Sequence, residues 1–304
     1  MGLRLIKFIF FGNYFIGLIA IALTIESTVQ LNLPFNSLSY YILIGLSPIV
    51  YYTYAYMGVN KLTKTNNPRT LWYIEKAEFI KKSQRVLTVI SLTTFLYIIL
   101  NNVSSILHLP FPYWIAVFLL LLAALLYYGL LPSYFFNLNL RNTGWLKPFI
   151  IGFVWACTAN ILPLIVLKIE TGINVSGSAL WIWLFVKNWM FCTVNAIMFD
   201  MKDYAIDANK ELKTIVVRMG LRKTIFKVLI PLLGIGMSSL LIFTTLAHFK
   251  TLTIIFNFIP FVLTLIVAYS LNKRKKILFY LIIIDGLILV KALCGIAGAL
   301  LHPH

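Results

Sequence analysis

The sequence predicts an all-α, polytopic integral membrane protein. Of its 304 residues, 61% are hydrophobic and only 12% are charged, which is too little charge for the surface of an ordinary soluble domain. The apolar residues also gather into long runs that short polar and basic segments separate. We therefore expect lipid to surround most of the chain, and we expect a single transmembrane domain over residues 1–304.

About nine apolar runs are long enough to cross a bilayer as helices. Crossing takes about 20 residues, because each residue rises about 1.5 Å and the hydrocarbon layer is about 30 Å thick. The boundaries of such runs are uncertain by a few residues. The expected spans are 8–25, 40–59, 86–106, 111–131, 148–167, 179–199, 224–247, 252–271 and 277–300.

The distribution of basic residues predicts the orientation in the membrane. Lys and Arg accumulate in the cytoplasmic loops of membrane proteins. Sorting them into alternate loops leaves only Lys168 and Lys250 on one side. This asymmetry places the N-terminus in the cytoplasm and the C-terminus outside, and we expect a bacterial inner membrane. The net charge of +17 is divided among short blocks between apolar runs, so it does not predict nucleic-acid binding.

Two connections on the cytoplasmic side are longer than the others. They comprise residues 60–85 and 200–223, and they follow the second and the sixth expected span. Long loops in compact domains commonly form the lid or wall of a functional site. We therefore expect these two segments to cap a site.

Acidic residues are concentrated where the sixth expected span ends. Of the nine in the chain, four lie within twelve positions: Asp200, Asp203, Asp207 and Glu211. On a helix, offsets of three and seven place the first three on one face, where their charges repel. Neighbouring lysines or a divalent cation that bridges to a phosphorylated ligand would relieve this repulsion, and Mg²⁺ prefers such oxygen ligands. A solvated amphipathic helix with internal ion pairs is the alternative.

The same stretch resembles the second aspartate-rich motif of the UbiA superfamily of intramembrane prenyltransferases. In that family DxxDxxxD is followed by a short basic stretch, a Lys-Thr-like step and a Leu-Gly-like close, after the sixth of nine helices. Here the three aspartates are followed by Lys213 and Thr214 and then by Arg-Met-Gly at 218–220. The segment 145–156, which enters the fifth expected span, also looks like the family.

The resemblance implies a helical bundle around a central cavity. In this family Mg²⁺, held by acidic motifs, binds the diphosphate of a prenyl donor, and a hydrophobic or aromatic acceptor attacks the resulting allylic cation. Metal and basic groups stabilise the departing diphosphate, and aromatic rings can stabilise the cation. The resemblance thus implies that Asp200, Asp203 and Asp207 hold Mg²⁺ and take part in catalysis. Residues expected to bind the diphosphate are Asn60, Lys61, Lys64, Arg69, Lys147 and Lys213.

The first acidic motif of the family is absent from the corresponding segment, 54–69. In one interpretation Lys61, Lys64 and Arg69 pair directly with the diphosphate, so that the enzyme works with fewer metal ions. In the other, the chain binds an isoprenoid lipid or a partner without turnover. We favour the enzyme, because an intact second motif has little purpose in a purely structural bundle. A secondary transporter ranks lower, because paired interrupted helices with central charges are not evident.

Several polar residues fall inside the expected spans. Ionisable groups are costly in lipid, so Lys187, Asp285 and Lys291 should face a cavity or one another, and both a functional and a structural role are open for them. Asn188 and Asn195 are seven residues apart on the sixth expected span. We expect them to line the cavity below the metal, with interhelical hydrogen bonding as the alternative.

Overall fold

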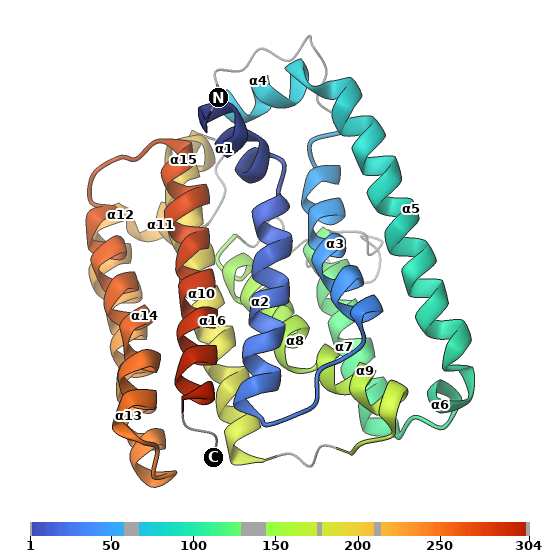
Figure 1. Ribbon diagram of the computed structural model, residues 1–304. Helices are drawn as coiled ribbons and strands as arrows, with labels where there is room; N and C mark the ends of the chain where they lie inside the picture. The colour runs from blue at the N-terminus through green and yellow to red at the C-terminus, as the bar shows by residue number, and fades with distance from the viewer. Residues whose placement is uncertain (1, 58–66, 129–143, 175–177, 210–213, 302–304) are drawn as a thin grey trace, which may run out of the picture.

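The computed structural model describes residues 2–57, 67–128, 144–174, 178–209 and 214–301. The protein is 85% helical, and these ranges contain no strand, which confirms the all-α prediction (Figure 1). Two π-helical turns, η1 (Ile225–Leu229) and η2 (Tyr280–Ile284), interrupt the α-helices. The α-helices are α1 (Gly2–Phe11), α2 (Tyr14–Gln30), α3 (Leu38–Tyr54), α4 (Pro68–Glu75), α5 (Ala77–Asn101), α6 (Val103–Leu107), α7 (Phe111–Tyr128), α8 (Lys147–Asn160), α9 (Leu162–Thr171), α10 (Ala179–Asn209), α11 (Ile215–Met219), α12 (Leu221–Thr224), α13 (Ile230–Leu246), α14 (Thr251–Ser270), α15 (Ile277–Phe279) and α16 (Asp285–Leu300).

Within the described ranges, six helical segments are long and apolar enough to cross a membrane, or seven if α1 and α2 together form one bent span. The chain is therefore a multi-pass membrane protein. Two of the nine expected spans, 40–59 and 111–131, are not among these segments. The helix of the first, α3, has 17 residues and contains Pro48, which is less than the roughly 20 residues that a straight crossing needs. The helix of the second, α7, has 18 residues, and the end of that expected span lies outside the described residues.

The helices form one bundle in which α2, α10 and α16 are central (Figure 1). α10 packs most extensively on α8, α16 packs on α2 and α14, and α3 packs on α2 and α5. Burial follows this arrangement, since 61% of the most apolar stretch of α10 is buried inside the protein but only 11% of that of α5. α5 therefore presents its apolar side chains to lipid, whereas α10 can carry side chains into an interior site.

The first expected span, 8–25, is broken near its start. α1 and α2 meet at an angle of 62°, and Asn13 between them has a left-handed backbone with φ of 65°. Asparagine tolerates this conformation better than most residues other than glycine. After the break α2 continues to Gln30. Glu26 therefore lies within this helix, and its side chain is buried.

The two segments expected to be capping loops are largely helical where the structure describes them. Residues 67–85 form α4 and the beginning of α5, and α10 extends without interruption to Asn209 before α11 and α12 follow. α4 starts with Pro68 in its first turn, behind an Asn67 side chain that accepts a hydrogen bond from the backbone N–H of Arg69. This combination favours a helix start. The segments 58–66 and 210–213 lie outside the described residues.

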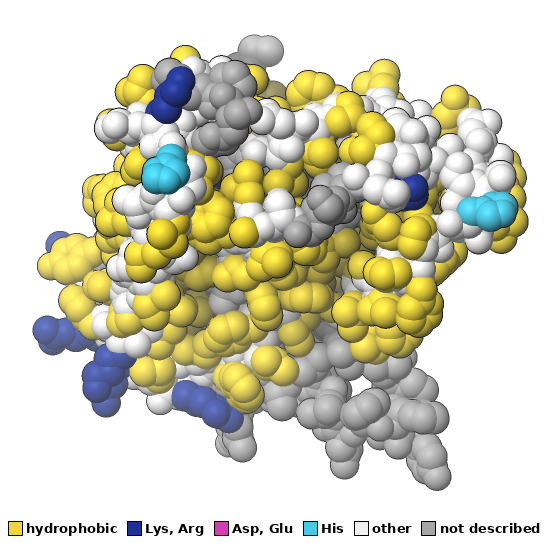
Figure 2. All heavy atoms as spheres, turned by 90° about the horizontal axis from the view of Figure 1, so that it is seen from below, with side chains coloured by type: hydrophobic (Ala, Val, Ile, Leu, Met, Phe, Trp, Pro, Cys, Tyr) yellow, Lys and Arg dark blue, Asp and Glu magenta, His cyan; other side chains and the backbone are white. Residues whose placement is uncertain are grey.

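The two ends of the bundle differ. One end, here called the α4 face, carries α1, α4 and the N-terminal region, whereas the chain leaves α16 at the opposite end, here called the far face (Figure 1). Figure 2 looks onto the far face, which hydrophobic and uncharged side chains largely cover, with few Lys or Arg visible.

Candidate functional site

A cavity of about 320 Å³ lies in the half of the bundle nearer the α4 face. Its volume is typical of small-molecule sites, which range from roughly 300 to 1,000 Å³. Helices α2, α3, α4, α8, α10 and α16 contribute to its wall. The lining residues are Asn13, Ile16, Ile19, Tyr52, Ala55, Tyr56, Arg69, Lys147, Ile151, Trp155, Cys192, Asn195, Ala196, Phe199, Asp200, Lys202, Asp203, Leu281, Asp285 and Ile288.

Asp200 supplies a buried carboxylate to this cavity. Its Oδ1 accepts a hydrogen bond of 2.9 Å from Lys147 Nζ, and the two groups also form an ion pair. Its Oδ2 is buried and has no hydrogen-bond partner. Lys147 is the first residue of α8, so the ion pair ties the start of α8 to α10. A buried charged oxygen without a partner is costly, so Asp200 has one oxygen available to a ligand.

The other two aspartates of the motif occupy different surroundings. Asp203 lies one helical turn beyond Asp200, lines the cavity and pairs with Lys202 at 3.3 Å. Asp207 lies another turn along α10 and is not part of the cavity wall. Only two of the three predicted carboxylates therefore face the same space.

Arg69 is held beside the cavity by hydrogen bonds to residues at the break between α1 and α2. Its Nη2 donates to Asn13 Oδ1 at 2.6 Å and to the carbonyl of Phe11 at 3.2 Å, at the C-terminal end of α1. Tyr73 donates to the same carbonyl at 2.8 Å. Burial raises the pKa of Tyr73, so its phenol remains a neutral donor. Arg69 Nε is buried without a partner, and no carboxylate of the described residues pairs with this guanidinium.

Aromatic rings form the part of the cavity wall beside Arg69 and Lys202. The Arg69 guanidinium lies 4.6 Å from the centre of the Tyr56 ring, and Lys202 Nζ lies 5.7 Å from that of Phe199. Trp155 donates its indole N–H to Tyr52 Oη at 3.3 Å, which fixes both rings. The faces of such rings attract positive charge.

Two polar groups lie further from the α4 face. Asn195 donates from Nδ2 to the Phe191 carbonyl at 2.9 Å, and its buried Oδ1 has no hydrogen-bond partner. Asp285, which is only 7% exposed, also lines the cavity from the start of α16. The cavity thus combines apolar walls with a few polar atoms, as sites for amphiphilic ligands do.

The three aspartates do not form one metal site. Within the described residues, no three Asp, Glu, His or Cys side chains are grouped so that they could hold a metal ion. Mg²⁺, however, usually binds proteins through one or two carboxylates and completes its shell with phosphate oxygens and water. Asp200, with its unpartnered Oδ2, and Asp203 fit that smaller set.

The other predicted site residues are divided between three locations. Arg69, Lys147 and Asn195 line the cavity with the two aspartates. Asn188 does not, because it faces Asn160 and Lys291 in a polar cluster deeper in the bundle. The remaining diphosphate-binding candidates, Asn60, Lys61, Lys64 and Lys213, lie outside the described residues.

Sequence reasoning missed two residues that the structure brings into these sites. Asn13 positions Arg69, but a single Asn in an apolar run does not reveal that the helix breaks there. Glu26 is buried against Lys187 and Lys291, although it follows the last residue of the expected first span. One signal could have found Glu26: a buried lysine needs an acidic partner, and few acids lie near apolar runs.

No protein-family model, no curated protein and no solved structure matches this chain. The geometry of the cavity and the motif in α10 therefore carry the functional argument.

Proposed function

We propose that this chain is a membrane prenyltransferase that binds a prenyl diphosphate in the cavity at the α4 face. The observation that carries the proposal is the meeting of Asp200 and Asp203 with Arg69 and Lys147, from three separate helices, in one cavity. The motif in α10 resembles the second acidic motif of the UbiA superfamily. The surrounding aromatic and aliphatic wall suits an isoprenoid chain and a hydrophobic or aromatic acceptor.

Charge balance supports the involvement of a cation. The described wall contains three basic side chains, Arg69, Lys147 and Lys202, and three acidic ones, Asp200, Asp203 and Asp285. A diphosphate would add negative charge to this balanced wall. Mg²⁺ held by Asp200 and Asp203 would supply the compensating charge and stabilise the leaving group.

In the proposed reaction the bond between C1 of the prenyl chain and the diphosphate oxygen breaks, and the electron pair leaves with the diphosphate. The acceptor then forms a bond to C1 and releases a proton to water. Arg69 and Lys147 would bind and orient the diphosphate oxygens, since charge-assisted hydrogen bonds to phosphate are strong. Tyr52, Tyr56, Trp155 and Phe199 would face the allylic cation and exclude water.

The proposal includes a topology. The α4 face would lie in the cytoplasm of a bacterial cell, with the N-terminus inside and the C-terminus outside the inner membrane. This orientation follows from the basic residues of the chain. A nine-span arrangement would require α3 and α7 to cross the membrane as well.

The test is a turnover assay with purified protein in lipid. We expect Mg²⁺-dependent release of diphosphate from a labelled prenyl diphosphate when a set of hydrophobic aromatic acceptors is supplied. Asp203→Asn should abolish release, because it removes a metal ligand while keeping the side-chain shape. Glu75→Gln is the matched control: it removes an exposed carboxylate on the same face, outside the cavity, and should retain wild-type release.

A second function is favoured by the absence of a three-carboxylate group among the described residues and of the first acidic motif. In this alternative the cavity holds an isoprenoid lipid without turnover. Saturable binding of labelled prenyl diphosphate, with no release at any Mg²⁺ concentration, would select it over the enzyme.

A further inference from the structure

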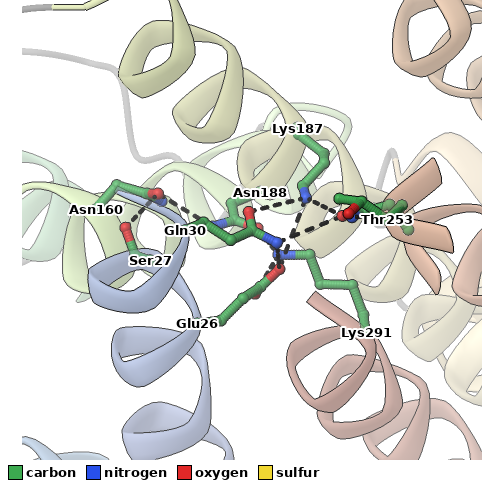
Figure 3. Close-up of polar contacts among 9 residues, drawn as sticks. Glu26, Ser27, Gln30, Asn160, Lys187, Asn188, Thr253 and Lys291 are labelled. Atoms are coloured by element: carbon green, nitrogen blue, oxygen red, sulfur yellow. Dashed lines mark hydrogen bonds and ion pairs between the residues drawn. The ribbon is translucent and has the colours of Figure 1, made fainter. Parts of the chain in front are cut away.

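A second group of charges lies in the interior of the bundle, apart from the cavity (Figure 3). Glu26 of α2 pairs with Lys291 of α16 at 2.7 Å and with Lys187 of α10 at 3.6 Å. All three side chains are buried, with exposed fractions of 1%, 4% and 6% respectively for the residues. Ionisable groups at such positions in membrane proteins commonly mark pathways for protons or ions.

The cluster contains one more base than acid. Two ammonium groups beside one carboxylate would leave an unbalanced positive charge in the membrane interior. In the described part of the chain no other acidic side chain pairs with either lysine. The neighbouring elements add no second acid: α14 supplies Asn257 and α8 supplies Asn160, while Cys192 lies one turn along α10. A buried uncompensated charge is costly, so the cluster is most stable with one lysine neutral.

Lys187 is the better candidate for the neutral lysine. Lys291 has the shorter bond to Glu26 and also donates to Asn188. Lys187 Nζ instead donates to Asn257 Oδ1 at 3.1 Å and to Gln30 Oε1 at 3.5 Å. A neutral amine has two N–H donors, which these two amide oxygens satisfy, and an ammonium has a third, which Glu26 can accept. Both protonation states of Lys187 therefore find partners.

Two hollows lie near the cluster, one on each side of it along the bundle. Toward the far face, a hollow of about 10 Å³ is lined by Gln30, Leu180, Phe249, Thr253, Asn257 and Ala299, so two of the side chains that bind Lys187 also line it. This volume is near the minimum that holds one water molecule. It is too small for a hydrated ion.

On the other side of the cluster, residues at the floor of the large cavity lie one helical turn from residues of the cluster. Cys192 and Ile288 line that cavity, and Asn188 and Lys291 of the cluster lie four and three residues from them on the same helices. One helical turn spans about 5.4 Å, so the cluster lies about that distance beyond the cavity floor.

We propose that Glu26, Lys187 and Lys291 form a proton relay between the two hollows, in which Lys187 carries the exchangeable proton. An N–H bond forms at Lys187 when a water molecule in the far-face hollow gives up a proton. The bond breaks when the Glu26 carboxylate accepts that proton. Lys291, which is bonded to Glu26, then releases a proton to water at the floor of the cavity and takes the proton from Glu26. Only a proton moves, so no other reactant is consumed. The relay does not depend on the prenyltransferase proposal.

The relay is tested by proton flux into liposomes that contain the purified protein and an internal pH-sensitive dye, with a K⁺ gradient and valinomycin setting the voltage. We expect wild-type protein to carry protons and Lys187→Met to lose the flux, falling to the level of empty liposomes. Lys187→Arg should lose it as well, because a guanidinium keeps the charge but does not release its proton. Thr244→Val is the matched control, since Thr244 is buried in α13 and bonds only carbonyls of its own helix.

Two results would overturn the relay. One is a wild-type flux no greater than that of empty liposomes, which would leave the cluster as a structural ion pair. The other is a flux in Lys187→Arg equal to that of wild type, when both proteins are monodisperse and have similar melting temperatures. Should Lys187→Met fail to fold, the comparison of wild type with Lys187→Arg decides alone.

Discussion

Individual residues show which parts of the site can be found from spacing and which cannot. Asp200 and Asp203 were predicted from their separation on one helix face, and the structure places both in one cavity. Lys187 and Lys291 were recognisable because charges are rare in apolar runs, but their partner Glu26 was not, since α2 extends beyond its expected end. Asn13 escaped prediction because its role depends on a left-handed backbone that forms only in the folded bundle.

Arg69 offers a direct test of the contacts at the break between α1 and α2. Replacing it in Arg69→Met removes the donors to Asn13 and to the Phe11 carbonyl and leaves the buried amide oxygen of Asn13 without its donor. Losing such bonds to a charged group costs about 1–3 kcal/mol. We expect a lower melting temperature in detergent, whereas Arg222→Met, at an exposed position, should melt as wild type does. Equal melting temperatures for the two variants would show that the Arg69 network contributes nothing to stability.

At the level of elements, most of the predicted helices are present but several boundaries differ. The apolar runs at 179–199, 252–271 and 277–300 correspond closely to α10, α14 and the α15 to α16 segment. Composition reports whether a segment is apolar, but it does not report a bend such as the one at Asn13 or the shortness of α3. It also did not show that α10 continues as a helix to Asn209. Along this helix Asp207 lies one turn beyond Asp203, and it is not part of the cavity wall.

The packing of α8 on α10 sets the position of Lys147 relative to Asp200, and Gly152 permits the close approach. A Cβ at this position would lie 2.8 Å from the backbone N of Thr193 and 2.8 Å from the carbonyl oxygen of Trp189. Gly152→Ala should therefore push the helices apart and cost about 1–3 kcal/mol, as overpacking does.

The control for this substitution is Gly234→Ala in α13, where an added Cβ meets no atom within 4 Å. Alanine favours a helix over glycine by roughly 0.5–1 kcal/mol, so this variant should melt at or above the wild-type temperature. Opposite shifts of the melting temperature are the expected outcome. A Gly152→Ala protein as stable as Gly234→Ala would contradict the close contact between α8 and α10.

Across the whole molecule, two polar sites occupy one apolar bundle and use the same three central helices. α2, α10 and α16 contribute both to the cavity and to the Glu26 cluster, and each site lies at its own depth. The sequence was sufficient for the all-α membrane class and for the closeness of Asp200 and Asp203 on α10. It did not show how deep in the bundle the cavity residues and the Glu26 cluster lie, because these positions depend on how helices from distant parts of the chain pack.

The central claim is that the cavity at the α4 face binds a lipid with a diphosphate head. Its most direct test is equilibrium binding of a labelled prenyl thiolodiphosphate, whose sulfur bridge resists ionisation, to purified protein with Mg²⁺ and after chelation by EDTA. We predict saturable binding that EDTA weakens, that Asp203→Asn also weakens, and that Glu75→Gln leaves unchanged. Binding that is indifferent to Mg²⁺, EDTA and Asp203→Asn would contradict the account.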